Sequence, residues 1–216
     1  MTYEIIRNGV SRSFPDGDAF FDGAAPGGDV LLYLGAPPAT VEADDGRTAV
    51  LVELGTESLG VHTGENAGEE GSNVLGFARY RNGDDPPSAL IELVRQPASD
   101  ATAIAAAKAM FEEAGLTVCI CTDQPGRIVD RLVRPKYNAA LRFLDEGLAT
   151  AKDMDLTCKM GLGYPDGPIE RLERGGLENH YDVTQALFET FGTPGYAPAR
   201  RAIVAKARVA KSRERK

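Results

Sequence analysis

The pattern of apolar and polar positions differs between the two halves of the chain. In the first half, short apolar runs at residues 29–34 and 49–53 are bounded by glycine, proline or polar segments, as is typical of buried strands. We expect further strands at residues 3–7, 74–80, 89–95 and 116–121. Strands that alternate with helical or looped links predict an α/β layer.

The links between these strands carry their own signals. Residues 55–71 are acidic and rich in glycine, which predicts a loop or a weak helix. Residues 81–87 form a polar turn that joins two expected strands. Residues 99–114 form the clearest helix of this half, with Ser99 or Asp100 as its N-terminal cap and Gly115 as its end.

From Pro125 onward the apolar residues recur at helical spacing. A long amphipathic helix is expected from Ile128 to about Leu148, and Pro135 should either kink it or fit one turn in. Further helices are expected at residues 151–160, 166–174, 177–191 and 198–213. The sequence therefore predicts an α/β domain at residues 1–122 and an all-helical domain at residues 123–216.

Charge and composition narrow the classes of partner. Residues 1–124 contain 20 acidic and 7 basic residues, whereas residues 200–216 carry 8 basic residues and one acid. An acidic first half repels phosphate groups, so we expect no nucleic-acid partner, and the basic tail lacks the interleaved aromatic residues of a nucleic-acid site. We see no apolar run of the ~18 residues that a membrane helix needs, and no signal peptide. The three cysteines lack zinc-site spacing, so we expect free thiols in the cytoplasm.

Two segments of the second half resemble the 3-hydroxyacyl-CoA dehydrogenase family. Residues 123–141 read D-Q-P-G-R-I-V-D-R-L-V-R-P-K-Y-N-A-A-L, similar to the family pattern D-x-P-G-F-I-V-N-R-L-L-x-P-Y-x-N-E-A. Residues 147–170 resemble its next stretch, which ends in L-G-x-G-x-P-x-G-P-F-E. The resemblance implies an all-helical domain that forms homodimers and closes over acyl-CoA. In this stretch, Gly161, Gly163 and Gly167 are expected to form a rigid turn with positive φ angles.

The first half resembles only the later part of the family's nucleotide-binding layer. Residues 29–37, 49–59, 75–77 and 89–97 are similar to four successive strands of the family. The resemblance implies a truncated Rossmann-like layer. A dinucleotide site needs a G-x-G-x-x-G turn between a strand and a helix. No such turn stands before residue 29. We therefore expect no bound cofactor, and NAD only if another site replaces the missing one.

The resemblance also identifies four candidate catalytic positions. Glu92 stands at the glutamate of the family's His–Glu acid/base pair, whereas Gly76 stands where the histidine belongs. Glu57 falls on a serine beside the substrate, with Ser58 next to it, and Asp130 falls on an asparagine. His62 can replace the histidine only if its loop folds back, and His180 is not at that place.

Two interpretations of the carboxylates remain. Glu57, Glu92 and Asp130 can share one cleft, where they do acid/base work or hold a cation. Alternatively, the cleft is vestigial and Asp130 pairs with Arg127 or Arg134 on its helix.

Three functions follow from these interpretations. The first is a non-catalytic relative that forms a homodimer through the helical domain or pairs with a full-length dehydrogenase. The second is an acyl-CoA enzyme, either an active 3-hydroxyacyl-CoA dehydrogenase completed by a partner chain's cofactor site or an enzyme that runs a different reaction with the carboxylates. The third is a binding protein for acyl-CoA.

Overall fold

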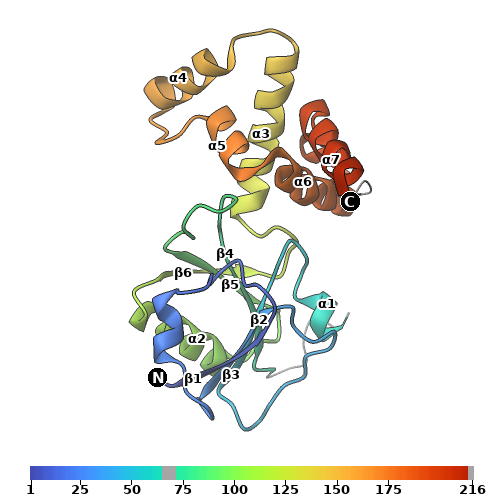
Figure 1. Cartoon of the computed structure of the whole chain (residues 1–216). Coiled ribbons are helices and arrows are strands. Elements are labelled where there is room, and N and C mark those ends of the chain that lie inside the picture. Colours follow the sequence, from blue (N-terminus) through green and yellow to red (C-terminus); the bar gives the residue numbers. More distant parts are fainter. Residues whose placement is uncertain (65–71, 214–216) are drawn as a thin grey trace. The chain divides into compact units, whose positions relative to one another are not determined.

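The computed structural model describes residues 1–64 and 72–213, which form a mixed sheet followed by a set of helices (Figure 1). The elements are β1 (Tyr3–Asn8), η1 (Ala19–Gly23), β2 (Val30–Gly35), β3 (Ala49–Glu53), α1 (Gly60–Thr63), β4 (Val74–Arg79), β5 (Leu90–Arg95), α2 (Ala101–Glu113), β6 (Thr117–Thr122), α3 (Val129–Asp145), α4 (Ala151–Leu162), α5 (Pro168–Gly175), α6 (Leu177–Phe191), η2 (Pro194–Tyr196) and α7 (Arg200–Arg213). Within the stretch 55–71, expected as a loop or weak helix, α1 forms, and residues 65–71 lie outside the described residues.

The chain forms two compact units. The α/β unit comprises residues 1–81 and 86–127, and the helical unit comprises residues 82–85 and the chain from Ile128 onward. Residues 82–85 are the tip of the hairpin between β4 and β5. In the helical unit Asn82 donates to the carbonyl of Arg171 at 3.1 Å, and Asp85 pairs with Arg174 at 2.8 Å. No local sequence pattern indicates this long-range association.

The strands lie in the sheet in the same order as in the chain, β1 to β6. The first four are parallel, and β5 and β6 run antiparallel to them. In a doubly wound sheet the order is 3-2-1-4-5-6, so strand one adjoins strand four. Here β1 adjoins β2, and the order in the sheet is that of the chain. The described strands contain no reversal of order, which is the feature that creates a nucleotide crevice in such sheets.

Alternate residues of the central strands supply two separate cores, because successive side chains of a strand point to opposite faces. On one face, Leu51 of β3 packs with the aromatic side chains of Phe14, Phe77 and Phe111, under η1 and α2 (Figure 1). On the other face, Val52 packs in a smaller cluster with residues that include Leu54, Leu59, Val74 and Val94. The expected α/β layer is thus confirmed, and its central strands are buried on both faces.

The structure confirms one expected helix cap and corrects the expected turn after α4. Asp100 caps α2 as expected, since its carboxylate accepts the amide protons of Thr102 and Ala103. The expectation of three positive φ angles in the turn after α4 is wrong for two glycines. Only Gly163 has one, at +68°, whereas Gly161 lies inside α4 and Gly167 has a φ of −75°.

Gly167 is required for a different reason than its backbone angle. An added Cβ would collide with the side chain of Asp155, which lies against this position. The Asp155 carboxylate accepts the amide protons of Ile169 and Glu170 at 2.8 and 3.1 Å, and so caps the first turn of α5. The glycine-rich turn therefore serves to bring α4 and α5 together.

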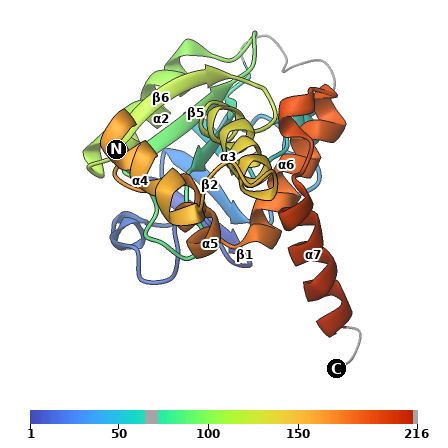
Figure 2. The ribbon, with the colours of Figure 1, turned by 90° about the horizontal axis from the view of Figure 1, so that it is seen from above.

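The helical unit packs around α3, which holds Pro135 inside its second turn. Proline has no amide proton, so the carbonyl of Arg131 loses its helical partner, and the hydroxyl of Tyr196 approaches that oxygen to 3.5 Å. Figure 2 shows α6 beside α7, whose last turns extend toward the C-terminus. Within residues 1–64 and 72–213, no helix is long and apolar enough to cross a membrane.

A buried polar network joins α3 to α6 in the helical unit. Asn138 donates to Thr184 at 2.7 Å, and its side-chain oxygen lies 3.0 Å from Nε2 of His180. Nδ1 of His180 lies 3.3 Å from a guanidinium nitrogen of Arg134, which can only donate. His180 is therefore neutral, with its proton on Nε2. Burial, and then the charge of Arg134, lower the pKa of His180 to about 3.

This network predicts that the helical unit loses stability in mild acid. The unfolded histidine titrates near pH 6.5, so below that pH the unfolded chain binds a proton that the folded chain does not. We expect the free energy of unfolding to fall by about 2 kcal/mol from this group between pH 7 and pH 5. Urea denaturation of the wild type and of His180→Gln, followed by circular dichroism, measures it. Equal losses in the two proteins would show that His180 is not the group responsible.

Candidate functional site

Glu92 lies in the middle of β5 and is buried in the α/β unit. Its carboxylate oxygen lies 3.7 Å from Nε of Arg127, and the two side chains are 5% and 3% exposed. The distance is too long for a hydrogen bond but short enough for an ion pair. Arg127 occupies the place of the phenylalanine in the pattern D-x-P-G-F. The sequence interpretation missed this residue as a partner of Glu92, although the exchange of an apolar residue for arginine was visible.

Arg127 also fixes the loop that follows β3. Its guanidinium donates to the carbonyl of Glu57 at 3.3 Å and to the carbonyl of Gly55. The backbone of Arg127 has a φ of +45°, the only positive φ of a non-glycine residue among those the structure describes. A bulky residue adopts this conformation only where the surrounding contacts hold it. The ion pair and the two carbonyl contacts supply that restraint.

The position expected for a catalytic histidine is closed. Gly76 lies on β4, and an added Cβ would come within 2.5 Å of Leu54 and 3.2 Å of Val94. Both neighbours are buried members of the smaller apolar core. A side chain at this position would therefore displace packed side chains. A Glu92–histidine pair of the expected kind cannot form here without rebuilding the core.

His62 lies on α1, beside Glu57 rather than at position 76. Its Nε2 is 3.7 Å from a carboxylate oxygen of Glu57, and its Nδ1 is 3.2 Å from the carbonyl of Pro38. The imidazole side chain is 11% exposed. The same oxygen of Glu57 accepts the amide proton of Gly55 at 2.9 Å. The loop thus folds back far enough to form a carboxylate–imidazole pair, but with Glu57.

Ser58 and the start of α1 are held by a residue that sequence interpretation did not select. The carboxylate of Asp123 accepts the amide protons of Leu59 and Gly60 at 2.6 and 2.9 Å. It also accepts a hydrogen bond from Gln96 at 3.3 Å. Asp123 is the first residue of the pattern D-x-P-G, which could have identified it. Its role here is to fix the loop that carries Glu57 and Ser58.

Asp130 belongs to the helical unit and pairs with Arg134 four residues later, at 2.7 Å. This is one of the two pairings expected for a structural role. Glu57 and Glu92 belong to the α/β unit. Among residues 1–64 and 72–213, no three histidine, cysteine, aspartate or glutamate side chains are grouped so that they could hold a metal ion.

The thiol of Cys121, which lies close enough to Glu92 to feel its charge, is unsuited to nucleophilic chemistry. Cys121 of β6 packs against the smaller apolar core. Burial, followed by the negative charge of Glu92, raises the pKa of Cys121 to about 11. The thiolate is the reactive form of cysteine, so this side chain stays protonated and unreactive at neutral pH.

A buried side-chain carboxylate, that of Glu53, lies at the carboxyl ends of the first three strands. Glu53, the last residue of β3, is 6% exposed. It accepts hydrogen bonds from the Ser11 hydroxyl at 2.9 Å, the Ser13 amide at 2.7 Å and the Gly35 amide at 2.7 Å. Ser11 and Ser13 follow β1 and Gly35 ends β2, so the donors lie at the strand ends where a dinucleotide fold directs donors at a phosphate. In this chain the three donors already bind the carboxylate of Glu53.

The link between β1 and β2 also lacks the helix that binds the pyrophosphate of a dinucleotide in this kind of fold, among the residues that the structure describes. It contains the five-residue 3₁₀ helix η1 and, within the described residues, no α-helix whose first turn could face a pyrophosphate. A single glycine, Gly9, follows β1 before Val10 and Ser11. The residues present therefore do not form the glycine-rich cradle that NAD requires.

Comparison with known proteins relates both units to one group of enzymes. Residues 126–216 match the family model described as 3-hydroxyacyl-CoA dehydrogenase, C-terminal domain. A 3-hydroxybutyryl-CoA dehydrogenase of Mycobacterium tuberculosis is 30% identical over 144 residues, which are 66% of this chain and 50% of that protein. The mitochondrial hydroxyacyl-coenzyme A dehydrogenase of Homo sapiens is 33% identical over 93 residues, 43% of this chain and 30% of that protein. The chain thus spans half or less of these relatives.

Solved structures share the fold. FadB2 of M. tuberculosis aligns with a TM-score of 0.67 at 23% identity, over 81% of this chain and 64% of that one. The (S)-3-hydroxybutyryl-CoA dehydrogenase of Ralstonia eutropha aligns with a TM-score of 0.65 at 23% identity, over 86% and 66%. At this identity the likeness shows the fold: a Rossmann-like layer followed by helices.

Proposed function

Because the chain belongs to the 3-hydroxyacyl-CoA dehydrogenase family, we propose that it is a relative that neither binds NAD nor transfers hydride on its own, and that it acts as a non-catalytic or ligand-binding protein in acyl-CoA metabolism. The observation that carries this proposal is the pairing of Glu92 with Arg127. An acid/base unit needs an imidazole that the carboxylate orients. Here the carboxylate faces a guanidinium, which cannot take a proton from a hydroxyl group.

Two further observations support the loss of redox chemistry. The place of the histidine at Gly76 is closed by Leu54 and Val94. The donors at the carboxyl ends of β1 and β2 bind Glu53. A phosphate at that edge would have to displace a buried carboxylate and then face the acidic residues of this unit. Both parts of the dehydrogenase reaction, proton transfer and cofactor binding, are therefore disfavoured in this chain.

A steady-state assay tests this proposal. The purified protein is mixed with NADH and acetoacetyl-CoA, and the absorbance of NADH is followed over a range of protein concentrations. We expect no oxidation above the rate without protein. Turnover that rises in proportion to protein concentration would overturn the proposal.

An enzyme of the same family remains the second candidate, and the Glu57–His62 pair favours it. A carboxylate 3.7 Å from an imidazole is the arrangement that acid/base catalysis uses. Such an enzyme would use a partner chain's cofactor site or a reaction without hydride transfer. Its activity would disappear in His62→Gln, whereas a binding protein would keep its affinity for acyl-CoA in that variant.

Binding of acyl-CoA would involve the helical unit, as the family resemblance implies. Several basic residues of α7 form ion pairs within this unit. Arg200 and Arg201 pair with Asp145, and Lys206 pairs with Asp182. These ion pairs neutralise part of the positive charge of α7, so the helix would attract the phosphates of a CoA ester less strongly.

We also propose that the helical unit forms a homodimer or pairs with a full-length dehydrogenase through the outer face of α4. No residue of α4 is buried, although the helix is rich in apolar residues. Four large apolar side chains in and just before α4 are more than half exposed: Leu148 at 68%, Leu156 at 53%, Met160 at 80% and Leu162 at 62%. Leu156 and Met160 are four residues apart and share one face of α4, and exposed apolar residues that lie together mark interaction surfaces.

We expect Met160→Lys to weaken this association. A fully exposed methionine that becomes buried in an interface contributes about 2 kcal/mol, so its loss should raise the dissociation constant roughly 30-fold. Size-exclusion chromatography with light scattering at micromolar concentration measures the change. Val10→Lys, at a position 77% exposed in the α/β unit, is the matched control and should leave the assembly intact. A monomeric wild type would contradict the proposed homodimer.

A further inference from the structure

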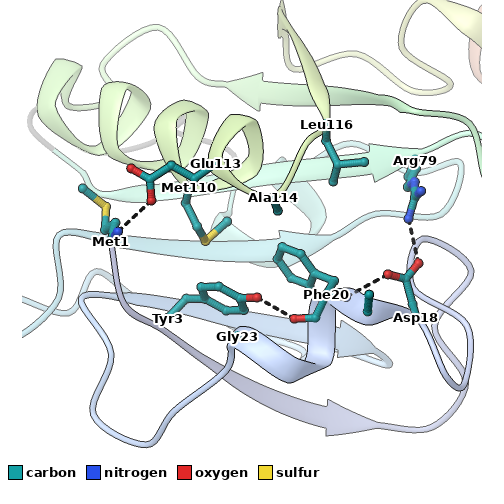
Figure 3. A pocket seen from close by; sticks show the side chains of 11 residues that line it. Met1, Tyr3, Asp18, Phe20, Gly23, Arg79, Met110, Glu113, Ala114 and Leu116 are labelled. Atoms are coloured by element: carbon teal, nitrogen blue, oxygen red, sulfur yellow. Dashed lines mark hydrogen bonds and ion pairs between the residues drawn. The ribbon is translucent and has the colours of Figure 1, made fainter.

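A pocket of about 410 Å³ lies in the α/β unit, at the end of α2 and beside η1 (Figure 3). The side chains of Tyr3, Phe20, Met110 and Leu116 supply its apolar wall. Phe20 stacks on Tyr3 with ring centroids 4.7 Å apart, so this part of the wall is rigid. All the lining residues belong to one unit, and none of them belongs to the Glu92 site.

The pocket arises from the way the sheet is covered. Parallel strands are joined by a crossover connection of a dozen or more residues, usually an α-helix that covers the sheet face. The link from β1 to β2 has only the five residues of η1, which at about 2 Å per residue span roughly 10 Å. The thirteen residues of α2 span about 20 Å on the same face. The shorter η1 covers less of this face than α2 does, and residues of η1 and of the end of α2 line the open space between them.

Two ion pairs border the pocket and balance each other. Arg79 pairs with Asp18 at 2.9 Å, and the amino group of Met1 pairs with Glu113 at 2.7 Å (Figure 3). The rim thus carries two positive and two negative charges. Asp18 and Glu113 would repel an anionic ligand such as a CoA phosphate, and the paired cations would repel an amine. A neutral molecule would be repelled by neither kind of charge.

The wall also offers polar groups that can fix a ligand. Arg79 uses Nε for the carbonyl of Ser88 and Nη1 for Ser13 and Asp18. Its Nη2 has no hydrogen-bond partner among the described residues, so it remains a donor. The hydroxyl of Tyr3 donates to the carbonyl of Phe20 at 2.5 Å, and burial raises the pKa of this phenol, which stays neutral.

We propose that this pocket binds a neutral, mainly apolar small molecule, aromatic or branched aliphatic, with one acceptor oxygen directed to Arg79. Ligand pockets span about 300–1,000 Å³, and an apolar cavity of about 150 Å³ already binds benzene. The volume here therefore suits a ligand of one or two rings. The proposal does not require the loss of NAD binding, because no residue that lines the pocket belongs to the nucleotide edge, which Arg79 contacts through Ser13.

Three probes of nearly equal size test the chemistry. Acetophenone is neutral with one acceptor oxygen, ethylbenzene lacks the oxygen, and benzoate carries a charge. The full chain, with Met1 as its first residue so that the pair with Glu113 is kept, is titrated with each probe and followed by amide NMR shifts of Gly23 and Leu116. We expect acetophenone to bind at millimolar or lower concentration, about tenfold more tightly than the other two.

Two variants place the binding in this pocket. Ala114 lies at the exposed mouth, so Ala114→Trp should block entry and weaken acetophenone binding at least about tenfold. Ala105→Trp adds the same side chain at an exposed position of α2 that does not line the pocket, and should leave binding unchanged. The proposal is overturned if acetophenone does not bind the wild type at millimolar concentration, if benzoate binds as tightly, or if Ala114→Trp binds like the wild type.

Discussion

Replacement of Glu92 by glutamine should lower the free energy of unfolding by about 3–5 kcal/mol, as the loss of one partner from a buried ion pair does. The reason is Arg127, whose side chain is 3% exposed and would be left with an uncompensated charge. The family resemblance, which marks Glu92 as the remnant of a catalytic pair, predicts that this substitution leaves folding intact. The buried pair with Arg127 predicts a loss of stability instead. Urea denaturation of both proteins measures the difference.

Two comparisons show whether the effect comes from the pair. Glu112→Gln removes an exposed carboxylate that pairs with Lys108, and should change the stability by less than about 0.5 kcal/mol. In an Arg127→Met background, Glu92→Gln should cost less than it does alone, by about 0.5–3 kcal/mol. If Glu92→Gln matched the wild type within about 1 kcal/mol, the effect of one ordinary substitution, Glu92 would not be a structural partner of Arg127.

Replacement of Glu53 by alanine should cost at least about 3 kcal/mol, because hydrogen bonds to a charged group contribute about 1.5–3 kcal/mol each. The substitution leaves the Ser11 hydroxyl and the amides of Ser13 and Gly35 without their acceptor. These groups lie at the ends of β1 and β2, so the first two strands should lose protection against amide hydrogen exchange before the rest of the sheet.

An added anion provides the control for Glu53. Formate at high concentration should restore part of the stability of Glu53→Ala and leave the wild type unchanged, because only the variant has open donors. Glu53→Gln keeps one acceptor oxygen and should be intermediate. Equal effects of formate on wild type and variant would mean that these donors do not form an anion site.

Much of the fold could be predicted because its signals are local. Buried parallel strands are short apolar runs, and residues 29–34 and 49–53 have that form. Asp100 and Gly115 mark the ends of α2 by their own chemistry. By contrast, the place of β1 beside β2 depends on pairing between residues far apart in sequence. Nothing in residues 3–7 specifies that neighbour.

The site was less predictable, because its decisive contacts are long-range. Glu92 was found through a family resemblance, but its partner Arg127 arrives through a tight turn with a positive φ. The roles of Asp123 and Asp155 are similar, since each caps a helix from a distant part of the chain. A sequence pattern shows that such residues recur, whereas only the structure shows which amide protons they accept.

The titration of the purified protein with NADH, followed by calorimetry, tests the central claim most directly. Acetoacetyl-CoA is titrated separately, so that loss of the cofactor site is distinguished from loss of all ligands. We predict no binding of NADH at sub-millimolar concentration, because Glu53 occupies the donors at the carboxyl ends of β1 and β2. Binding of NADH in that range would contradict this account and would require a cofactor site of a different kind.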